Sequence, residues 1–113
     1  MKPRCIVQPH SAKDVSAAVK TLTRLGDKAC PFAVRAGGHT PWAGSANIQD
    51  GVTIDLSAWN QATVSSDGDT VYAGPGATWG DIYSKTDPLN LTVVGGRASQ
   101  VGVAGLTLGG MFA

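Results

Sequence analysis

The residue types best suited to chemistry lie in one short stretch, Arg35-Ala36-Gly37-Gly38-His39, which follows an apolar run at positions 32–34. Two adjacent glycines adopt backbone angles that a Cβ would forbid, and they let the main chain approach a ligand closely. Successive N–H groups in such a turn form a concavity that binds anions. A histidine held at its rim can act as a nucleophile, an acid–base group or a metal ligand. The stretch therefore predicts a ligand-binding loop.

A second glycine-rich stretch covers residues 95–110, where glycines at positions 95, 96, 102, 105, 109 and 110 alternate with small or apolar residues. No acidic residue follows Asp87. A loop with many free N–H groups and little negative charge suits a pyrophosphate. We therefore interpret the rest of the chain as a scaffold that presents two glycine-rich loops.

Other binding motifs fit less well. The glycines at 74, 76 and 80 place the last one a residue too far for a dinucleotide-binding fingerprint, and Pro75 removes an N–H that phosphate would need. We interpret Gly74 and Gly76 as a tight turn between a strand and a helix. The sequence contains neither a P-loop lysine motif nor a Gly-x-Ser-x-Gly elbow. Metal binding at His39 is not favoured, because His10 is the only other histidine and belongs to a different loop.

The composition bounds the possible functions. A length of 113 residues allows one domain at most, and 42% hydrophobic with 15% charged residues is ordinary for a globular domain. The net charge of +1 gives no electrostatic argument for binding nucleic acid or an anionic membrane. No apolar run approaches the length of a membrane span. The first residues carry the basic charges of a signal peptide without its apolar stretch.

The two cysteines leave two readings open. Cys5 and Cys30 each lie at the entrance to an expected strand, so a disulfide is geometrically possible if those strands are neighbours. Such a bond would stabilise the fold by about 3–4 kcal/mol, and we favour it slightly over two buried thiols. Asn90 begins a glycosylation sequon. Both features lean towards an oxidising, secretory setting.

The first elements predict a strand–helix–strand unit. Residues 5–7 form an apolar run, and Ser11 followed by Asp14 is a helix-start signal. Gly26 is placed to end this helix before the apolar run at 32–34. Such a unit implies parallel pairing and a right-handed crossover. The apolar face of the helix consists of Val15, Ala18, Val19, Leu22 and Leu25.

The middle of the chain predicts strands of another kind. Residues 52–56 alternate as a half-buried strand does. Asp67-Gly68 lies between two β-prone runs at 63–65 and 70–73, which is a strong hairpin signal. We therefore expect an α+β fold with a mixed parallel and antiparallel sheet and flanking helices.

A second helix and a further strand are expected after the hairpin. Thr78 and Asp81 repeat the helix-start pattern, and Pro88 ends the helix. Its apolar face consists of Trp79, Ile82, Tyr83 and Thr86. Residues 91–94 read as a strand that runs into the second glycine-rich stretch.

Four segments, in this order and spacing, resemble one family: RAGGHTPWAG, TIDLS, GPGATWGDIY and TVVGGRASQVGVAGLTLGG. They are similar to the PCMH-type FAD-binding domain of berberine-bridge-enzyme-like oxidases, in the vanillyl-alcohol-oxidase group of flavoproteins. The resemblance covers nearly the whole chain, from about residue 5 to residue 113. It implies the amino-terminal portion of such a domain, residues 1–113, with the substrate-binding domain and the catalytic base beyond it.

The resemblance also implies the cofactor, FAD, and the residues that hold it. His39 matches the histidine that bonds to the flavin 8α-methyl carbon in this family. Relatives with a second, cysteinyl link carry the cysteine where this chain has Ala98, so we expect a histidyl link only. The expected cofactor-binding residues are Arg35, Ala36, Gly37, Gly38, His39, Thr40, Gly95, Gly96, Ser99, Gly102, Val103, Gly105, Leu106, Gly109 and Gly110.

By resemblance, a complete enzyme would move a hydride from an alcohol, sugar or alkaloid-like substrate to flavin N5, with oxygen as the acceptor. The resemblance also implies that the full-length protein is secreted. We expect this chain alone to have little activity. Two alternatives stay open: a reductase of the same fold that holds FAD without a covalent bond, and a truncated chain without catalytic function.

Overall fold

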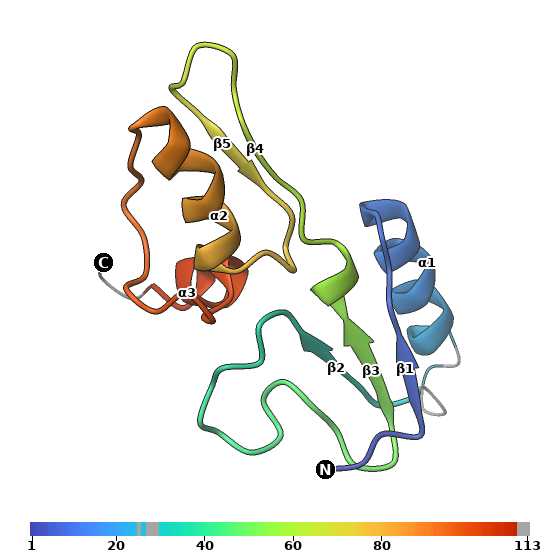
Figure 1. Ribbon diagram of the computed structural model, residues 1–113. Coiled ribbons are helices and arrows are strands. Elements are labelled where there is room, and N and C mark those ends of the chain that lie inside the picture. The colour runs from blue at the N-terminus through green and yellow to red at the C-terminus, as the bar shows by residue number, and fades with distance from the viewer. Residues whose placement is uncertain (25, 27–29, 111–113) are drawn as a thin grey trace.

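The computed structural model describes residues 1–24, 26 and 30–110. Its elements form two lobes side by side (Figure 1): a parallel sheet with one helix, and a hairpin with two helices. The radius of gyration is 15.7 Å, against about 13 Å for a compact domain of this length. The accessible surface is 7640 Å², where a compact monomer of this mass exposes about 5,800 Å². The two lobes therefore leave much surface uncovered.

The first lobe is a parallel sheet of three strands, β1 (Cys5–Val7), β2 (Phe32–Arg35) and β3 (Val52–Asp55). The strand order is β1-β3-β2, and both pairings are parallel. All four residues of β3 are buried. The expected half-buried alternation over residues 52–56 is therefore wrong, because β3 lies in the centre of the sheet with both faces covered.

The strand order also overturns the expected disulfide. β3 lies between β1 and β2, so Cys5 is two strand spacings, about 10 Å, from Phe32 at the start of β2, and Cys30 lies two residues before that strand. A disulfide requires Cα atoms within about 7 Å. Both cysteines are free and exposed. Secretion thus loses one of its two supporting arguments and stays a prediction.

Helix α1 (Ala12–Thr23) connects β1 to β2 and lies beside β1 (Figure 1). Its start is confirmed: the Ser11 side chain accepts a hydrogen bond from the Asp14 amide at 3.2 Å. Gly26 follows the helix with φ +53°, a conformation that favours glycine. The expected apolar face is half-buried, with Leu25 outside the described residues: Val15, Ala18, Val19 and Leu22.

The second lobe begins with the predicted hairpin. β4 (Ala62–Val64) and β5 (Val71–Ala73) pair antiparallel around the Asp67-Gly68 turn. The α+β class with parallel and antiparallel pairing is confirmed, and the two kinds of pairing belong to separate sheets. Tight packing explains two glycines after the hairpin: a Cβ on Gly74 would lie 2.4 Å from the Trp59 carbonyl oxygen, and one on Gly76 only 1.9 Å from that of Leu56.

Helix α2 (Trp79–Thr86) follows that turn, as predicted. The Thr78 side chain accepts from the Asp81 amide, and the Asp81 carboxylate accepts from the Thr78 amide, which completes a capping box. Three residues of the expected apolar face, Trp79, Ile82 and Thr86, are buried. A short 3₁₀ turn, η3 (Asp87–Leu89), ends the helix at Pro88.

The last described segment differs from the expectation in two ways. Residues 91–94 form no strand, and the Leu91 amide donates to the Thr86 carbonyl at the end of α2 instead. Residues 103–108 are not a loop: helix α3 (Val103–Leu108) forms there. Helical hydrogen bonds thus replace some of the free N–H groups expected between residues 95 and 110.

Candidate glycine-loop site

The two glycine-rich stretches meet at Gly37 and Gly102. A Cβ on Gly37 would lie 2.5 Å from the Gly102 amide nitrogen, and a Cβ on Gly102 would lie 2.7 Å from the Gly37 amide nitrogen. Such distances leave no room for any side chain at either position. The backbones of the two loops are therefore in direct contact, from sequence positions 65 residues apart.

Free backbone donors surround this junction. The described hydrogen bonds include none in which the amides of Gly37, Gly38, His39 or Thr40 donate to the backbone or to a side chain. Unpaired N–H groups at a turn of this kind bind anions. The junction thus has the donors that a phosphate group requires, and no described hydrogen bond competes for them.

His39 follows the junction directly and is exposed. It is held by a backbone turn at Gly38, which has φ +64°. The site begins where β2 ends, so the position of the imidazole depends on the pairing of β2 with β3. An exposed imidazole on a fixed loop is accessible to a bound molecule.

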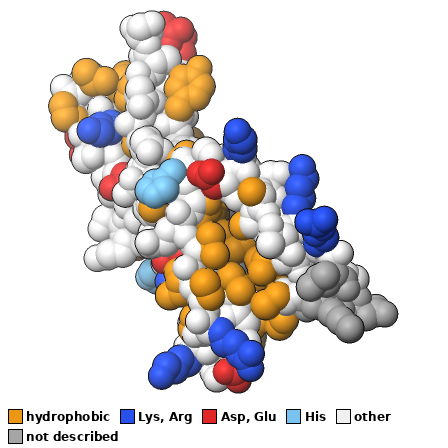
Figure 2. All heavy atoms as spheres, turned by 90° about the vertical axis from the view of Figure 1, so that its right-hand side faces the viewer, with side chains coloured by type: hydrophobic (Ala, Val, Ile, Leu, Met, Phe, Trp, Pro, Cys, Tyr) orange, Lys and Arg blue, Asp and Glu red, His pale blue; other side chains and the backbone are white. Residues whose placement is uncertain are grey.

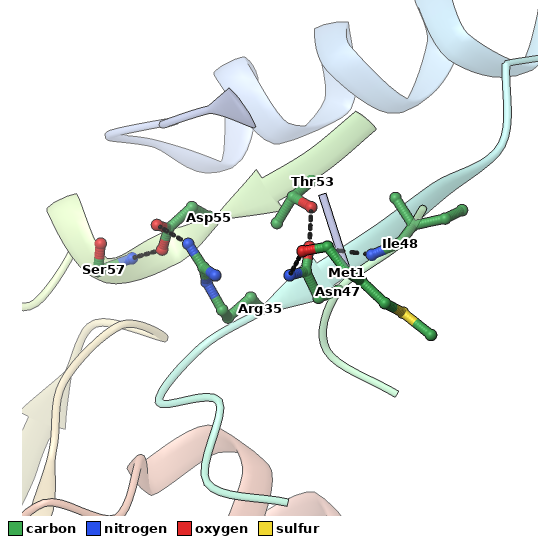
Figure 3. A network of polar contacts seen from close by, with 7 residues as sticks. All are labelled: Met1, Arg35, Asn47, Ile48, Thr53, Asp55 and Ser57. Atoms are coloured by element: carbon green, nitrogen blue, oxygen red, sulfur yellow. Dashed lines mark hydrogen bonds and ion pairs between the residues drawn. The ribbon is translucent and has the colours of Figure 1, made fainter. Parts of the chain in front are cut away.

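Arg35 anchors the start of this loop rather than pointing freely at a ligand. Its Nη2 lies 2.7 Å from Oδ2 of Asp55, the residue paired with it on β3 (Figure 3). Oδ1 of Asp55 accepts from the Ser57 amide at 3.1 Å. Burial would raise the pKa of Asp55, but the hydrogen bonds from Arg35 and Ser57 outweigh it and the pKa is lowered. Asp55 is therefore held as a carboxylate, and its charge is neutralised by Arg35.

Asn47 anchors the other end of the loop, and the sequence reasoning missed it. Its Oδ1 accepts from the Thr53 hydroxyl at 2.8 Å and from the Ile48 amide at 2.9 Å, while its Nδ2 donates to the Met1 carbonyl at 3.2 Å (Figure 3). Residues 36–51 are thus tied to β3 at both ends. The one signal in the sequence is an asparagine a few residues before a β-prone run, which is too common to identify such an anchor.

The second stretch is supported by the start of α2. Thr78 and Gly102 form an isolated antiparallel bridge. The Trp79 amide donates to the Val101 carbonyl at 3.0 Å, and the Val103 amide donates to the Ala77 carbonyl at 2.9 Å. Because these bonds hold residues 101–103, helix α2 positions the side of the junction that carries Gly102.

Gly95 and Gly96 pack on the ring of Trp79. A Cβ on Gly95 would lie 2.3 Å from Cζ3 of Trp79, and a Cβ on Gly96 would lie 2.7 Å from its Cδ1. The Tyr83 hydroxyl donates a hydrogen bond to the Gly96 carbonyl. Packing thus explains why both positions are glycine, and the segment passes over α2 with its backbone held.

Several amides at the end of the second glycine-rich stretch are used by helix α3. The amides of Leu106, Gly109 and Gly110 donate to carbonyls of Gly102, Gly105 and Thr107. These three amides are used within the chain, so a contact of Leu106, Gly109 or Gly110 with the cofactor would come from other atoms, and their binding role stays a prediction. The Leu106 side chain instead lies close to Gly96.

Two other kinds of site receive no support. Within residues 1–24, 26 and 30–110, no group of three His, Cys, Asp or Glu side chains could hold a metal ion. Among the helices in the described part of the chain, none is long and apolar enough to cross a membrane.

The residues at the junction fit the diphosphate of a dinucleotide. A cradle without Cβ atoms, free amides at residues 37–40 and one neutralised carboxylate, Asp55, provide close approach and little repulsion for an anion. His39 at the rim could bond to the ring system of the same ligand.

Comparison with known proteins identifies such a ligand in relatives. Residues 3–113 match the model of the FAD binding domain family. Over 110 residues the chain is 47% identical to the FAD-dependent monooxygenase sdcF of Emericella nidulans, covering 97% of this chain and 23% of that protein. It is 46% identical over 107 residues to the FAD-dependent monooxygenase drtC of Aspergillus calidoustus, covering 94% of this chain and 20% of that protein.

Solved structures of oxidases are also similar to this chain. The chain superposes on 6-hydroxy-D-nicotine oxidase from Arthrobacter nicotinovorans with a TM-score of 0.81 and 30% identity, covering 94% of this chain and 23% of that one. The TM-score is 0.77, with 28% identity, for the glucooligosaccharide oxidase of Acremonium strictum, covering 98% of this chain and 23% of that one. The chain spans about a fifth to a quarter of the length of these relatives. It belongs to the FAD binding domain family, as the resemblance of its sequence implied.

Proposed function

We propose that this chain forms part of the FAD-binding domain of a flavin-dependent oxidoreductase. The observation that carries the proposal is the backbone contact between Gly37 and Gly102, which joins two glycine-rich loops into one cradle. The amides of residues 37–40 would bind the diphosphate, and the segment around residues 95–102 would complete the cradle. When bound, the flavin would accept a hydride from a small organic substrate and pass the electron pair to oxygen.

We further propose that His39 bonds covalently to the flavin. A neutral imidazole nitrogen of His39 would be the nucleophile, giving up its proton as the bond to the 8α carbon forms, and the flavin would supply the electrophilic carbon, with oxygen as the two-electron oxidant that balances the bond. The FAD in the glucooligosaccharide oxidase of Acremonium strictum is a 6-S-cysteinyl, 8α-N1-histidyl FAD. Here Ala98 stands at the place expected for the cysteine, so only the histidyl bond could form.

The whole enzyme would be larger than this chain. Its relatives are about four to five times longer, and the accessible surface of 7640 Å² is about a third larger than that of a compact monomer. Figure 2 shows hydrophobic side chains gathered on one face. Ile6 of β1 and Val34 of β2 are 51% and 46% exposed. These observations support a role as the amino-terminal portion of a domain that further polypeptide, carrying the substrate site, would cover.

The relatives differ in the reaction that they are named for. Two of the fungal proteins are named monooxygenases, and two of the solved structures are named oxidases. Both reactions use oxygen, so we propose oxygen as the acceptor of electrons. The substrate would be a small molecule, as in the oxidases.

The test is the intact mass and absorbance spectrum of the protein after acid denaturation, in the longest polypeptide that carries this chain. We expect a yellow pellet in which the mass of the protein is raised by that of one FAD. This added mass should be absent in His39→Ala and present in His10→Ala. His10 is a matched control, because it is exposed and lies outside the cradle. A yellow supernatant would replace the covalent proposal by noncovalent binding. A folded protein without flavin in either fraction would refute both.

A further inference from the structure

Tyr83 and Trp79 form a rigid support under the second glycine-rich stretch. Both lie on α2, and their rings are 6.2 Å apart between centroids with 27° between the planes. Trp79 is 7% exposed. The Tyr83 hydroxyl donates to the Gly96 carbonyl, and this bond joins a helix residue to the backbone of the binding segment.

The support determines which way one peptide group faces. The Gly96 carbonyl points toward Tyr83, and the described peptide bonds include no cis bond. In a trans peptide the C=O and N–H groups point in opposite directions. The Arg97 amide must therefore point away from α2, and no described hydrogen bond uses it. An N–H group held outward in this way is available to a ligand.

Close packing keeps the segment from relaxing onto the helix. Positions 95 and 96 accept no Cβ, because the ring of Trp79 lies within 2.8 Å of each Cβ position. The Nε1 atom of Trp79 is buried and has no hydrogen-bond partner among the described residues. The close contacts on both glycines thus hold the ring under this segment.

We propose that Tyr83 and Trp79 are positioning residues for the cofactor. Tyr83 orients the Gly96–Arg97 peptide so that its N–H faces the bound diphosphate, and Trp79 sets the height of Gly95 and Gly96 above the helix. This inference rests on the proposed binding of FAD. It goes beyond it by assigning a function to two side chains that lie beneath Gly95 and Gly96 and would act through this backbone.

The test measures FAD affinity where no covalent bond can form. In the His39→Ala background, the dissociation constant for FAD is determined from flavin fluorescence, together with the visible circular dichroism of the bound flavin. Tyr83→Phe keeps the ring and removes one hydrogen bond, so we expect about three- to tenfold weaker binding and an altered flavin dichroism. Tyr72→Phe is the control, because Tyr72 lies on β5 and is 65% exposed.

A merely structural role predicts a different result. The thermal midpoint of the FAD-free protein would then fall in Tyr83→Phe, while affinity and dichroism of the folded fraction would match the parent, and this would overturn the inference. If neither the wild type nor the His39→Ala parent binds FAD, the proposed function fails and the inference fails with it.

A second measurement needs no flavin. The indole N–H resonance of Trp79, assigned with Trp79→Phe, reports the position of Gly96. We expect Tyr83→Phe to shift this resonance and to leave the resonance of Trp42 unchanged, because Trp42 is 77% exposed in the other lobe. An unshifted Trp79 resonance would show that the hydroxyl does not hold the segment, and would also overturn the inference.

Discussion

Replacing Gly37 by alanine tests whether the two loops are in contact. The new Cβ would lie 2.5 Å from the amide nitrogen of Gly102 and 2.7 Å from its Cα. Nonbonded atoms of this kind attract each other at separations of about 3.5 Å or more, so the loops must move apart by about 1 Å. Overpacking of this kind destabilises a protein by about 1–3 kcal/mol. We expect urea denaturation to show a decrease of that size in the free energy of unfolding. The amount of flavin bound per folded chain should also decrease.

Gly105→Ala is the matched control for stability. An added Cβ there has no atom within 4 Å, and the residue lies inside α3. Alanine in a helix is favoured over glycine by about 1 kcal/mol, so the free energy of unfolding should stay constant or rise. If Gly37→Ala loses less than about 0.5 kcal/mol, within the range of ordinary surface substitutions, and retains its flavin, the loops do not touch and the reasoning is refuted.

Three further predictions concern the scaffold. The pKa of Asp55 is lowered in the fold, so its carboxylate stabilises the protein above about pH 4, and this contribution is lost as the pH falls through the lowered pKa. The difference in free energy of unfolding between wild type and Asp55→Asn, measured with urea, should therefore shrink in acid. A constant difference would contradict the pairing with Arg35. Cys5 and Cys30 are free and exposed, so a thiol reagent should modify both in the folded protein without prior reduction; modification of neither would argue for a bond. Gly76→Ala puts a Cβ 1.9 Å from the Leu56 carbonyl, and we expect loss of the cooperative thermal transition, whereas an unchanged midpoint would refute the turn geometry.

Local signals in the sequence predicted the elements whose ends are specified by neighbouring residues. The caps at Ser11 and Thr78 bond within one helical turn, and the Asp67-Gly68 hairpin closes within a few residues. Such structure depends on short-range hydrogen bonds that can be read from residue types.

The errors arose where long-range packing decides. The burial of β3 on both faces depends on which strands flank it, and no residue within 52–55 records that order. Residues 91–94 are β-prone but form no strand, and the Leu91 amide donates to the Thr86 carbonyl at the end of α2. That both glycine-rich stretches serve one ligand was expected only from the family resemblance, and the contact of Gly37 with Gly102 was not predicted, because glycine spacing alone does not say which loops meet.

The strand order has a consequence for how the chain must fold. The central strand β3 is the last of the three in sequence, so β1 and β2 have no partner until residues 36–51, which carry His39, have been made and have turned back. During synthesis the chain therefore holds two unpaired strands whose edges can associate with other chains. Completion of the sheet requires closure of the loop at residues 36–51, so mutations that slow this closure should appear first as aggregation of the nascent protein.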